Sequence, residues 1–319
     1  MKPKEHIALK AYSHYEIGGP ARYFFAPKTM IELRAVAKAA KKIKLPSFVL
    51  GGGTNLLIAD EGFEGVVIKP DIKILKVSKN RIHAGAGVLM SELLEFATKK
   101  GLSGLEWAGG LPGTVGGAIR GNAGCFGGGT KDKIESVESF DLAKLVAKKR
   151  KNKECHFGYR SSVFKIKNGK EIVISATFLL KPGNKKEIKR SIDEKVAYRL
   201  KHHPIEYPNV GSIFKNVPIA QFKNVKHDGA SLAFKKGRKS YSMPVKVDPF
   251  HVVPAAYLIA ESGVKGVSFG GAMVSPKHPN FIVNAFDAKA SDVKTLISFV
   301  KSKVKDRFGV TLEEEVQVI

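Results

Sequence analysis

Glycine is concentrated in two segments of this 319-residue chain. Residues 109–129 read GGLPGTVGGAIRGNAGCFGGG and hold 10 of the 32 glycines, while residues 51–55 read GGGTN. Glycine loses the most backbone freedom on folding, so such density indicates tight turns or close approach of the backbone to a ligand. Amides of a tight turn can bind an anion. The two segments together predict a large phosphate-bearing cofactor held mainly by backbone amides.

Neither segment carries a familiar phosphate motif. Residues 51–55 belong to no GxGxxG that opens a helix and to no GxxxxGK[ST], so a Rossmann or P-loop site is not predicted. Taken alone, they are better explained as an ordinary turn than as a cofactor site. Residues 109–129 interleave apolar residues with glycine, unlike polar glycine–serine linkers. This favours an ordered wrap around a ligand, with a tightly packed crossover as the alternative.

Regular elements are predicted around these segments. Thr29 and Glu32 fit a capping box, and apolar residues follow at helical spacing until Pro46. The other predicted elements are strands at 48–50, 65–68, 136–142, 172–180 and 281–284 and helices at 90–100, 184–201, 254–262 and 291–308. Residues 217–253 are rich in lysine, glycine and proline and are predicted as a long loop or insertion. The tail, 313–319, is predicted as a strand.

Charge and composition narrow the possible classes. The chain has 54 basic against 29 acidic residues, a net charge of +25. No arginine-rich segment interleaved with aromatics is present, so the charge is interpreted as a solvated surface that attracts an anionic ligand. No run reaches the roughly 18 apolar residues of a membrane span, and the N-terminus lacks a signal-peptide core. These patterns predict a cytoplasmic protein without a nucleic-acid partner.

The cysteines and histidines predict no metal or disulfide chemistry. Cys125 and Cys155 are the two cysteines, and neither lies in a CxxC motif. The nine histidines include no HExxH and no other metal-binding spacing. Both cysteines are therefore interpreted as small core residues.

Three further groups of polar residues are each open to two interpretations. Arg160 follows Tyr159 after a glycine turn, but a single arginine is usually a surface residue. Ser212 follows a glycine without the GxSxG motif or a visible histidine–acid pair, so a strand start is the default. Glu313 and Glu315 would share one face of a strand, directed either to solvent or to a pocket.

Taken together, these segments resemble the UDP-N-acetylenolpyruvoylglucosamine reductase (MurB) family of peptidoglycan precursor synthesis. The matching words include IGGPA at 17–21, LGGGTNLL at 50–57, LPGTVGGA at 111–118, NAG at 122–124, FGYRSS at 157–162, GSIFKN at 211–216, KH at 277–278 and FIVN at 281–284. They occur in family order over nearly the whole chain. Each word is moderately specific, whereas the ordered set is strong.

The resemblance implies an α+β protein. We expect an FAD-binding fold of the vanillyl-alcohol-oxidase (PCMH) type in two α/β subdomains, at residues 1–70 and 71–183. A separate α+β substrate-binding domain is expected at 184–319, carrying the insertion 217–253. The tail 310–319 is expected near the site.

The resemblance also implies roles for individual residues. The implied catalytic residues are Arg160, Ser212 and Glu315. The implied FAD-binding residues are Gly51, Gly52, Gly53, Thr54, Asn55, Gly110, Pro112, Gly113, Thr114, Gly116, Gly117, Ala118, Asn122 and Gly124. The implied substrate-binding residues are Tyr159, Lys215, Asn216 and His278. No metal ligand is implied.

The implied reaction uses FAD and NADPH. NADPH reduces the flavin, which then reduces the enolpyruvyl ether of UDP-N-acetylglucosamine enolpyruvate to the lactyl ether of UDP-N-acetylmuramate. Hydride reaches the vinyl methylene and leaves negative charge spread into the neighbouring carboxylate. Arg160 and Glu315 would stabilise that charge, and Ser212 would protonate the α-carbon.

Two other functions stay open at this point. A flavin oxidase of the same fold, acting on another sugar or lactone, is the alternative enzyme, although it would not need the implied proton donor. A basic nucleic-acid-binding protein is the alternative from another class. The sequence also departs from the family where His202 occupies the position of a lysine, with Lys201 one residue earlier. No segment between Arg160 and Ser212 corresponds to the tyrosine loop of longer members, so the compact type is implied.

Overall fold

Helix α1 (Met30–Ile43) begins where the capping residues predicted it. The Thr29 hydroxyl accepts a hydrogen bond from the Glu32 amide at 3.2 Å, and the Glu32 carboxylate accepts one from the Lys28 amide at 2.6 Å. The helix ends at Lys44, which has a left-handed conformation with φ 59°. Its buried face packs against a four-stranded sheet. The sheet order is β1 (Lys4–Ala8), β2 (Pro20–Phe25), β5 (Phe63–Ile68), β3 (Ser47–Val49).

The chain folds into two units. This computed structural model describes residues 2–166, 170–222, 226–227, 229–236, 239–247 and 250–319. The first unit comprises Met1–Ala8, Pro20–Gly53 and Phe63–Lys201; the second comprises Leu9–Gly19, Thr54–Gly62 and His202–Ile319. Residues 184–201 therefore belong to the first unit rather than to the region expected for substrate binding. Two short stretches expected in the first region belong to the second unit.

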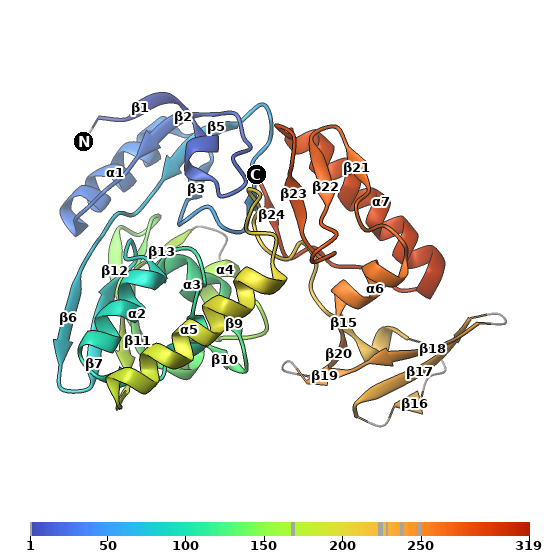
Figure 1. The fold of residues 1–319 in the computed structure, drawn as a ribbon. Helices are drawn as coiled ribbons and strands as arrows, with labels where there is room; N and C mark the ends of the chain where they lie inside the picture. The colour runs from blue at the N-terminus through green and yellow to red at the C-terminus, as the bar shows by residue number, and fades with distance from the viewer. Residues whose placement is uncertain (1, 167–169, 223–225, 228, 237–238, 248–249) are drawn as a thin grey trace. The chain divides into compact units, whose positions relative to one another are not determined.

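The first unit contains a second, fully antiparallel sheet with helices on it (Figure 1). Its order is β12 (Val146–Lys151), β11 (Ile134–Asp141), β13 (Glu171–Leu179), β7 (Arg81–Gly85), β6 (Leu75–Ser78). The helices are α2 (Met90–Lys99), α3 (Val115–Gly121), α4 (Val163–Ile166) and α5 (Lys185–His202). Short elements are β8 (Leu102–Ser103), η2 (Glu106–Ala108), β9 (Gly124–Cys125), β10 (Gly128–Gly129), η3 (Thr130–Asp132), η4 (Asn152–Cys155) and β14 (Lys181–Pro182). The strands and helices predicted for this region are confirmed within a few residues.

Strand β13 contributes to two hydrophobic cores. Ile172 and Ile174 pack in the core beneath α1, whereas Val173 and Ala176 pack in the core with α2 and α3. Strict alternation would place Ile174 and Ala176 on the same face. The pairing of β11 with β13 shifts register between Val173 and Ser175, so that Ile174 has no partner on β11, and such an irregularity reverses which face the following side chains take. The strand therefore joins the two layers of the first unit.

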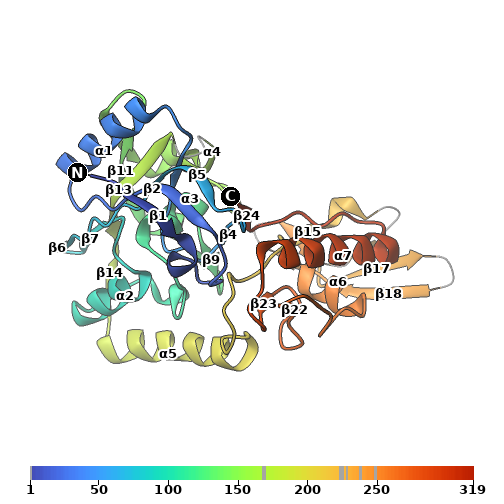
Figure 2. The same ribbon diagram turned by 90° about the horizontal axis from the view of Figure 1, so that it is seen from above.

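The second unit is built from short strands and two packed helices. Figure 2 shows α7 beside β22 and β23. The helices are α6 (Ala255–Glu261) and α7 (Ala290–Phe308), and the strands are β4 (Leu56–Leu57), β15 (Val217–Pro218), β16 (Lys226–His227), β17 (Ser231–Lys236), β18 (Lys239–Pro244), β19 (Lys246–Val247), β20 (His251–Val253), β21 (Ser268–Phe269), β22 (Ala272–Val274), β23 (Ile282–Asn284) and β24 (Gln317–Val318). Two 3-10 turns are η1 (Leu9–Tyr12) and η5 (Ile219–Gln221). Among the residues that the structure describes, no helix is long and apolar enough to cross a bilayer.

Two predictions for the second unit were wrong. The described residues between 217 and 253 do not form a long loop: β17 pairs with β16 and β18, and β20 pairs with β15 and β19. That this segment is an insertion stays a prediction. Leu232 and Met243 are register partners and are both fully buried; the lysines and serines around them obscure this apolar pair in the sequence. The tail is not a continuous strand, because only β24 and a single bridge at Glu314 are extended pairings.

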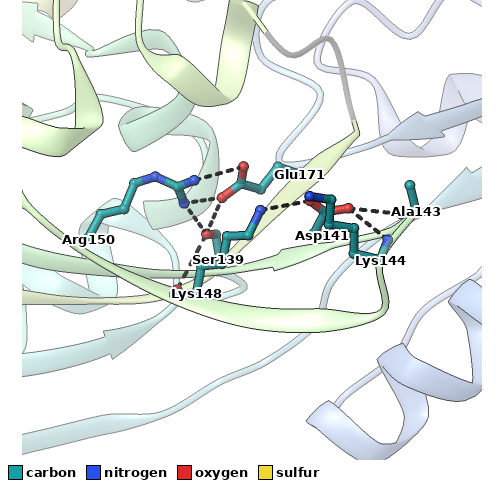
Figure 3. A network of polar contacts seen from close by, with 7 residues as sticks. All are labelled: Ser139, Asp141, Ala143, Lys144, Lys148, Arg150 and Glu171. Atoms are coloured by element: carbon teal, nitrogen blue, oxygen red, sulfur yellow. Dashed lines mark hydrogen bonds and ion pairs between the residues drawn. The ribbon is translucent and has the colours of Figure 1, made fainter.

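A buried ion pair joins β12 to β13 in the first unit. Arg150 donates to both carboxylate oxygens of Glu171, and the Ser139 hydroxyl also donates to that carboxylate (Figure 3). The Glu171 side chain is only 1 % exposed. A second pair, between Lys148 of β12 and Asp141 of β11, is more exposed. The Lys148 ammonium and the amides of the following turn lower the pKa of Asp141 to about 2.

Replacing Arg150 with methionine is expected to lower the free energy of unfolding by about 3–5 kcal/mol, because the buried Glu171 carboxylate loses the guanidinium that binds both of its oxygens. Urea unfolding followed by circular dichroism measures the loss. Lys148→Met on the same strand is the matched control, with an expected loss of about 1 kcal/mol or less. Equal losses in the two variants would contradict the special cost of the buried charge. Arg150→Met combined with Glu171→Leu should recover most of the stability.

Candidate cofactor and active site

The two glycine-rich segments meet in the first unit. A Cβ atom on Gly52 would lie 2.7 Å from the Cα of Gly113 and 3.3 Å from the amide nitrogen of Thr114. Within the described ranges, the amides of Gly51, Gly52 and Gly53 donate no hydrogen bond to the protein, nor do those of Gly113 and Thr114. Unpaired amides away from water are rare. We call these five residues the glycine cradle; at Gly52 its two backbone segments approach too closely for a side chain.

Backbone hydrogen bonds hold both sides of the glycine cradle in place. Strand β3 leads into Gly51, and the Leu50 amide donates to the Ile68 carbonyl at 2.9 Å. On the other side, the Met90 amide donates to the Gly113 carbonyl at 3.0 Å. The Val115 amide donates to a carbonyl before α2 at 2.8 Å. The donors of the glycine cradle therefore need no ligand to stay oriented, and they can bind an anion without reorganisation.

A small cavity of about 50 Å³ opens beside the glycine cradle. Its wall contains Gly51 and Thr114 from the glycine cradle and apolar residues from β3, α4 and β13. Arg120 and Glu171 are its charged lining residues. The sequence interpretation assigned no role to either. The sequence did contain a signal for Arg120. It is a charged residue on a predicted anion-binding segment, and it follows Gly117 by three positions and Gly116 by four.

Helix α3 connects the glycine cradle to the turn that carries Arg160. The Thr114 hydroxyl accepts from the Gly117 amide at 3.3 Å at the start of the helix. At its end Asn122 adopts a left-handed conformation, and its Nδ2 donates to the Gly158 carbonyl at 2.8 Å. Asn122 was predicted to bind cofactor; the structure gives it a role in positioning this turn.

Arg160 and Tyr159 lie together in this turn. Gly158 and Ser161 exchange backbone hydrogen bonds at 3.0 and 3.2 Å, which closes the turn. Arg160 has a φ of 50°, an unusual conformation for a residue with a side chain. Its guanidinium carbon lies 5.3 Å from the centre of the Tyr159 ring, and its Nη1 would lie 3.8 Å from a Cβ atom on Gly124. The predicted residues of the first unit thus include one group around Arg160 and one at the glycine cradle.

Ser212 and Glu315 lie on neighbouring backbone segments of the second unit. The Glu315 amide donates to the carbonyl of Ile213, the residue after Ser212, at 2.7 Å. The Lys215 amide donates to the Glu313 carbonyl, and the two side chains form an ion pair. The chain returns here after a long excursion, so this proximity could not be obtained from sequence spacing.

Asn55 ties the end of the second glycine-rich motif to the tail. Its Nδ2 donates to the Glu315 carbonyl at 3.1 Å, and its own carbonyl accepts from the Gln317 amide at 3.1 Å. The adjacent Leu56 pairs with Gln317 in the ladder of β4 and β24. The tail therefore lies beside Thr54 and Asn55, two of the predicted cofactor residues.

Asn216 and His278, two other predicted substrate-binding residues, contact different parts of the second unit. The Asn216 Oδ1 accepts from the Ala255 amide at the start of α6, at 3.2 Å. His278 lies edge-on to the rings of His203 and Phe281, with ring centres 5.4 and 4.7 Å away. Within the described part of the second unit, its buried Nδ1 has no hydrogen-bond partner. Burial lowers the pKa of His278, which favours the neutral ring.

Some of the predicted cofactor glycines have a packing explanation. Gly110 has φ 68°, and a Cβ atom there would lie 2.9 Å from the Arg199 side chain of α5. The Arg199 Nε donates to the Gly109 carbonyl at 2.9 Å. Helix α5 therefore lies directly on this stretch (Figure 1). Pro112 is exposed, while Ala118 is buried in the core beside α2; cofactor binding by these residues stays a prediction.

Comparison with known proteins adds to this geometry. Residues 21–144 match the family described as FAD binding domain, and residues 203–319 match UDP-N-acetylenolpyruvoylglucosamine reductase, C-terminal domain. The UDP-N-acetylenolpyruvoylglucosamine reductase of Lactobacillus delbrueckii subsp. bulgaricus is 38% identical over 99% of this chain and 95% of its own length. The chain belongs to the UDP-N-acetylenolpyruvoylglucosamine reductase family. The reductase of that name from Treponema denticola is 36% identical over 97% of this chain and 90% of its own length.

A solved structure of this reductase family has the same fold over the full chain. The UDP-N-acetylenolpyruvylglucosamine reductase of Thermus caldophilus, titled MurB, superposes with a TM-score of 0.76 at 31% identity, covering 100% of this chain and 99% of that one. The predicted α+β fold class and the predicted family are thereby confirmed. The chain is an FAD-dependent oxidoreductase of the reductase family.

The predicted site residues of this chain fall into two groups, according to which of the two family matches contains them. The whole glycine cradle lies inside the range that matches the FAD binding domain. Ser212, Lys215, Asn216, His278 and Glu315 lie inside the range that matches the reductase C-terminal domain. The FAD diphosphate fits the glycine cradle, because within the described ranges its five amides donate no hydrogen bond to the protein and Gly52 carries no side chain.

Proposed function

We propose that this protein reduces UDP-N-acetylglucosamine enolpyruvate to UDP-N-acetylmuramate, with NADPH as the reductant, in the cytoplasmic synthesis of peptidoglycan precursors. The name of its relatives, UDP-N-acetylenolpyruvoylglucosamine reductase, supports the substrate. Among the site residues themselves, the observation that carries the proposal is the backbone hydrogen bond from Glu315 to Ile213, the residue after Ser212, in the second unit. A reductase that must protonate carbon needs a donor and a second polar group close together.

The glycine cradle would hold the FAD diphosphate through its backbone amides. Gly52 would be essential here, since a Cβ atom would meet Gly113 before any phosphate oxygen could approach. Bound FAD supplies the hydride that is added to the vinyl methylene of the substrate. The amides stay fixed by the hydrogen bonds of β3 and α2, so binding of the diphosphate costs little reorganisation.

Arg160 would stabilise the negative charge that spreads into the substrate carboxylate. A planar guanidinium can bind both carboxylate oxygens, and its charge does not depend on pH. The closed turn and the Asn122 hydrogen bond fix the backbone of Arg160. Preorganised charge of this kind lowers the barrier most when it is directed to the site where charge develops.

Ser212 would donate the proton that completes the reduction at the α-carbon. A serine hydroxyl is a weak acid in water, but the charge-bearing carbon is a strong base, and fixed geometry makes the transfer feasible. Glu315 would share a proton or hydrogen bond with the charged carboxylate. Lys215 and His278 would contact the substrate from the same unit; Tyr159 and Asn216 complete the proposed set.

The visible absorption spectrum during an anaerobic half-reaction series tests this proposal. Purified protein should show flavin bands that bleach with NADPH and return with UDP-N-acetylglucosamine enolpyruvate under anaerobic conditions. Bands that return with oxygen but not with this substrate would instead indicate a flavin oxidase. A protein that stays colourless after addition of FAD would contradict the proposal altogether.

A further inference from the structure

Arg120 is a charged residue in the cavity beside the glycine cradle that the proposed chemistry does not use. It stands one residue before the end of α3, and its side chain lines the cavity together with Gly51, Thr114 and Glu171. Among the residues that the structure describes, none forms a hydrogen bond or ion pair with its guanidinium. Only its backbone carbonyl is engaged, by the Ser162 hydroxyl at 2.7 Å. The guanidinium of Arg120 is therefore able to bind an anion.

The free-energy cost of partly burying the Arg120 guanidinium favours the interpretation that a ligand is its partner. Removing a charge from water without a counter-charge is unfavourable, and burial lowers the pKa of Arg120 with no carboxylate acting in the opposite direction. Glu171 is the acidic residue of the cavity wall, but its carboxylate already accepts from Arg150 through both oxygens. Arg150 therefore neutralises the charge of Glu171, whereas no acidic residue among those described neutralises the charge of Arg120.

The helix geometry directs this side chain toward the glycine cradle. Long helical side chains lie back over the residues three and four positions earlier, toward the helix N-terminus. For Arg120 those residues are Gly117 and Gly116, which carry no side chain. Thr114 lies about 9 Å from Arg120 along the helix axis, and the two share the cavity wall. Gly117 is exposed and carries no side chain that would separate Arg120 from Thr114.

We infer that Arg120 forms an ion pair with the diphosphate of bound FAD and is a determinant of FAD affinity. This inference rests on the proposed placement of the diphosphate in the glycine cradle. The amides supply partial charges on one side of the diphosphate, and Arg120 supplies a full positive charge from α3. A guanidinium binds phosphate oxygens through two parallel N–H donors, which also orients the diphosphate in the glycine cradle.

FAD affinity of the stripped protein tests the inference. Apoprotein of wild type, Arg120→Gln and Arg120→Lys is titrated with FAD, and quenching of flavin fluorescence gives the dissociation constant. Arg120→Gln is expected to bind FAD about 10- to 100-fold more weakly, the usual worth of a charged hydrogen bond. Arg120→Lys should recover most of this loss because it retains the charge. Raising the salt from about 0.05 M to about 0.5 M should weaken the wild type more than Arg120→Gln, since salt screens the lost ion pair.

Arg190→Gln is the matched control. Arg190 lies on α5 of the same unit, its side chain is 77% exposed, and its partner Glu194 is equally a surface residue; FAD affinity should not change. An Arg120→Gln protein that binds FAD within about twofold of wild type would overturn the inference. So would Gln and Lys variants that are equally weak, because charge would then not be the cause. Failure of the wild type itself to bind FAD would instead overturn the proposed placement of the cofactor.

Discussion

Ser212→Ala is expected to leave the reduction of FAD by NADPH at its normal rate and to slow reoxidation by the enolpyruvyl substrate about 10²- to 10⁴-fold, the usual contribution of a positioned general acid. The two half-reactions respond differently because the hydroxyl is needed only when the α-carbon is protonated. Anaerobic stopped-flow measurement of flavin absorbance separates the two steps. The conclusion does not depend on overall turnover, in which a slow step can hide the affected one.

Ser268→Ala is the matched control for Ser212→Ala. Ser268 is an exposed serine of β21 in the same unit, and its hydroxyl makes only a long contact of 3.5 Å with a nearby carbonyl. Both half-reactions of this variant should equal those of the wild type. Equal slowing of both half-reactions in Ser212→Ala would show a general structural defect and exclude the proton-donor role. Normal reoxidation of that variant would exclude it as well.

The elements that local signals define were predictable from sequence. Thr29 and Glu32 placed the start of α1, and the glycines at 101, 263 and 309 mark the ends of α2, α6 and α7. Each of these glycines has a positive φ, a conformation that glycine adopts without steric cost. Caps and stops act over a few residues, so the sequence contains all of the information that they need.

The missed strands show where local signals fail. In β17 and β18 the described core contact is made by Leu232 and Met243. Each strand has only two apolar or aromatic residues in alternation, Leu232 with Phe234 and Tyr241 with Met243, a short signal for a strand. Burial of Leu232 and Met243 depends on the rest of the second unit, whose core contains both residues. Tertiary context, rather than propensity, decides such strands.

The candidate site was predictable as a set of residue types but not as a geometry. Glycine density indicated an anion site, yet the contact of Gly52 with Gly113 became visible only in the structure. The family words pointed to Ser212 and Glu315, while their adjacency arises from pairing between distant segments. Arg120 was missed because its significance lies in the absence of a partner among the described residues. Whether a side chain has a partner cannot be deduced from the sequence alone.

Gly52→Val is expected to yield protein without flavin, with FAD affinity reduced about 100-fold or more. The Cβ atom alone would lie 2.7 Å from the Cα of Gly113. Neither backbone segment can move freely, because Leu50 is hydrogen-bonded to Ile68 of β5 and Gly113 to Met90 at the start of α2. Overpacking of this kind costs up to about 3 kcal/mol, and 1.4 kcal/mol is a factor of ten in affinity. The flavin-to-protein absorbance ratio after purification and the FAD titration of apoprotein both measure the loss.

Gly121→Val separates loss of the glycine cradle from a general intolerance of β-branched residues in this segment. Gly121 ends α3 in the same unit, and a Cβ atom there would meet no atom within 4 Å, so flavin content should stay near that of the wild type. A Gly52→Val protein that unfolds at the wild-type urea concentration but lacks flavin would locate the defect in the glycine cradle. Full flavin content in that variant would mean that the diphosphate does not depend on these amides. The same result would remove the anion with which Arg120 is proposed to pair, so the two experiments constrain each other.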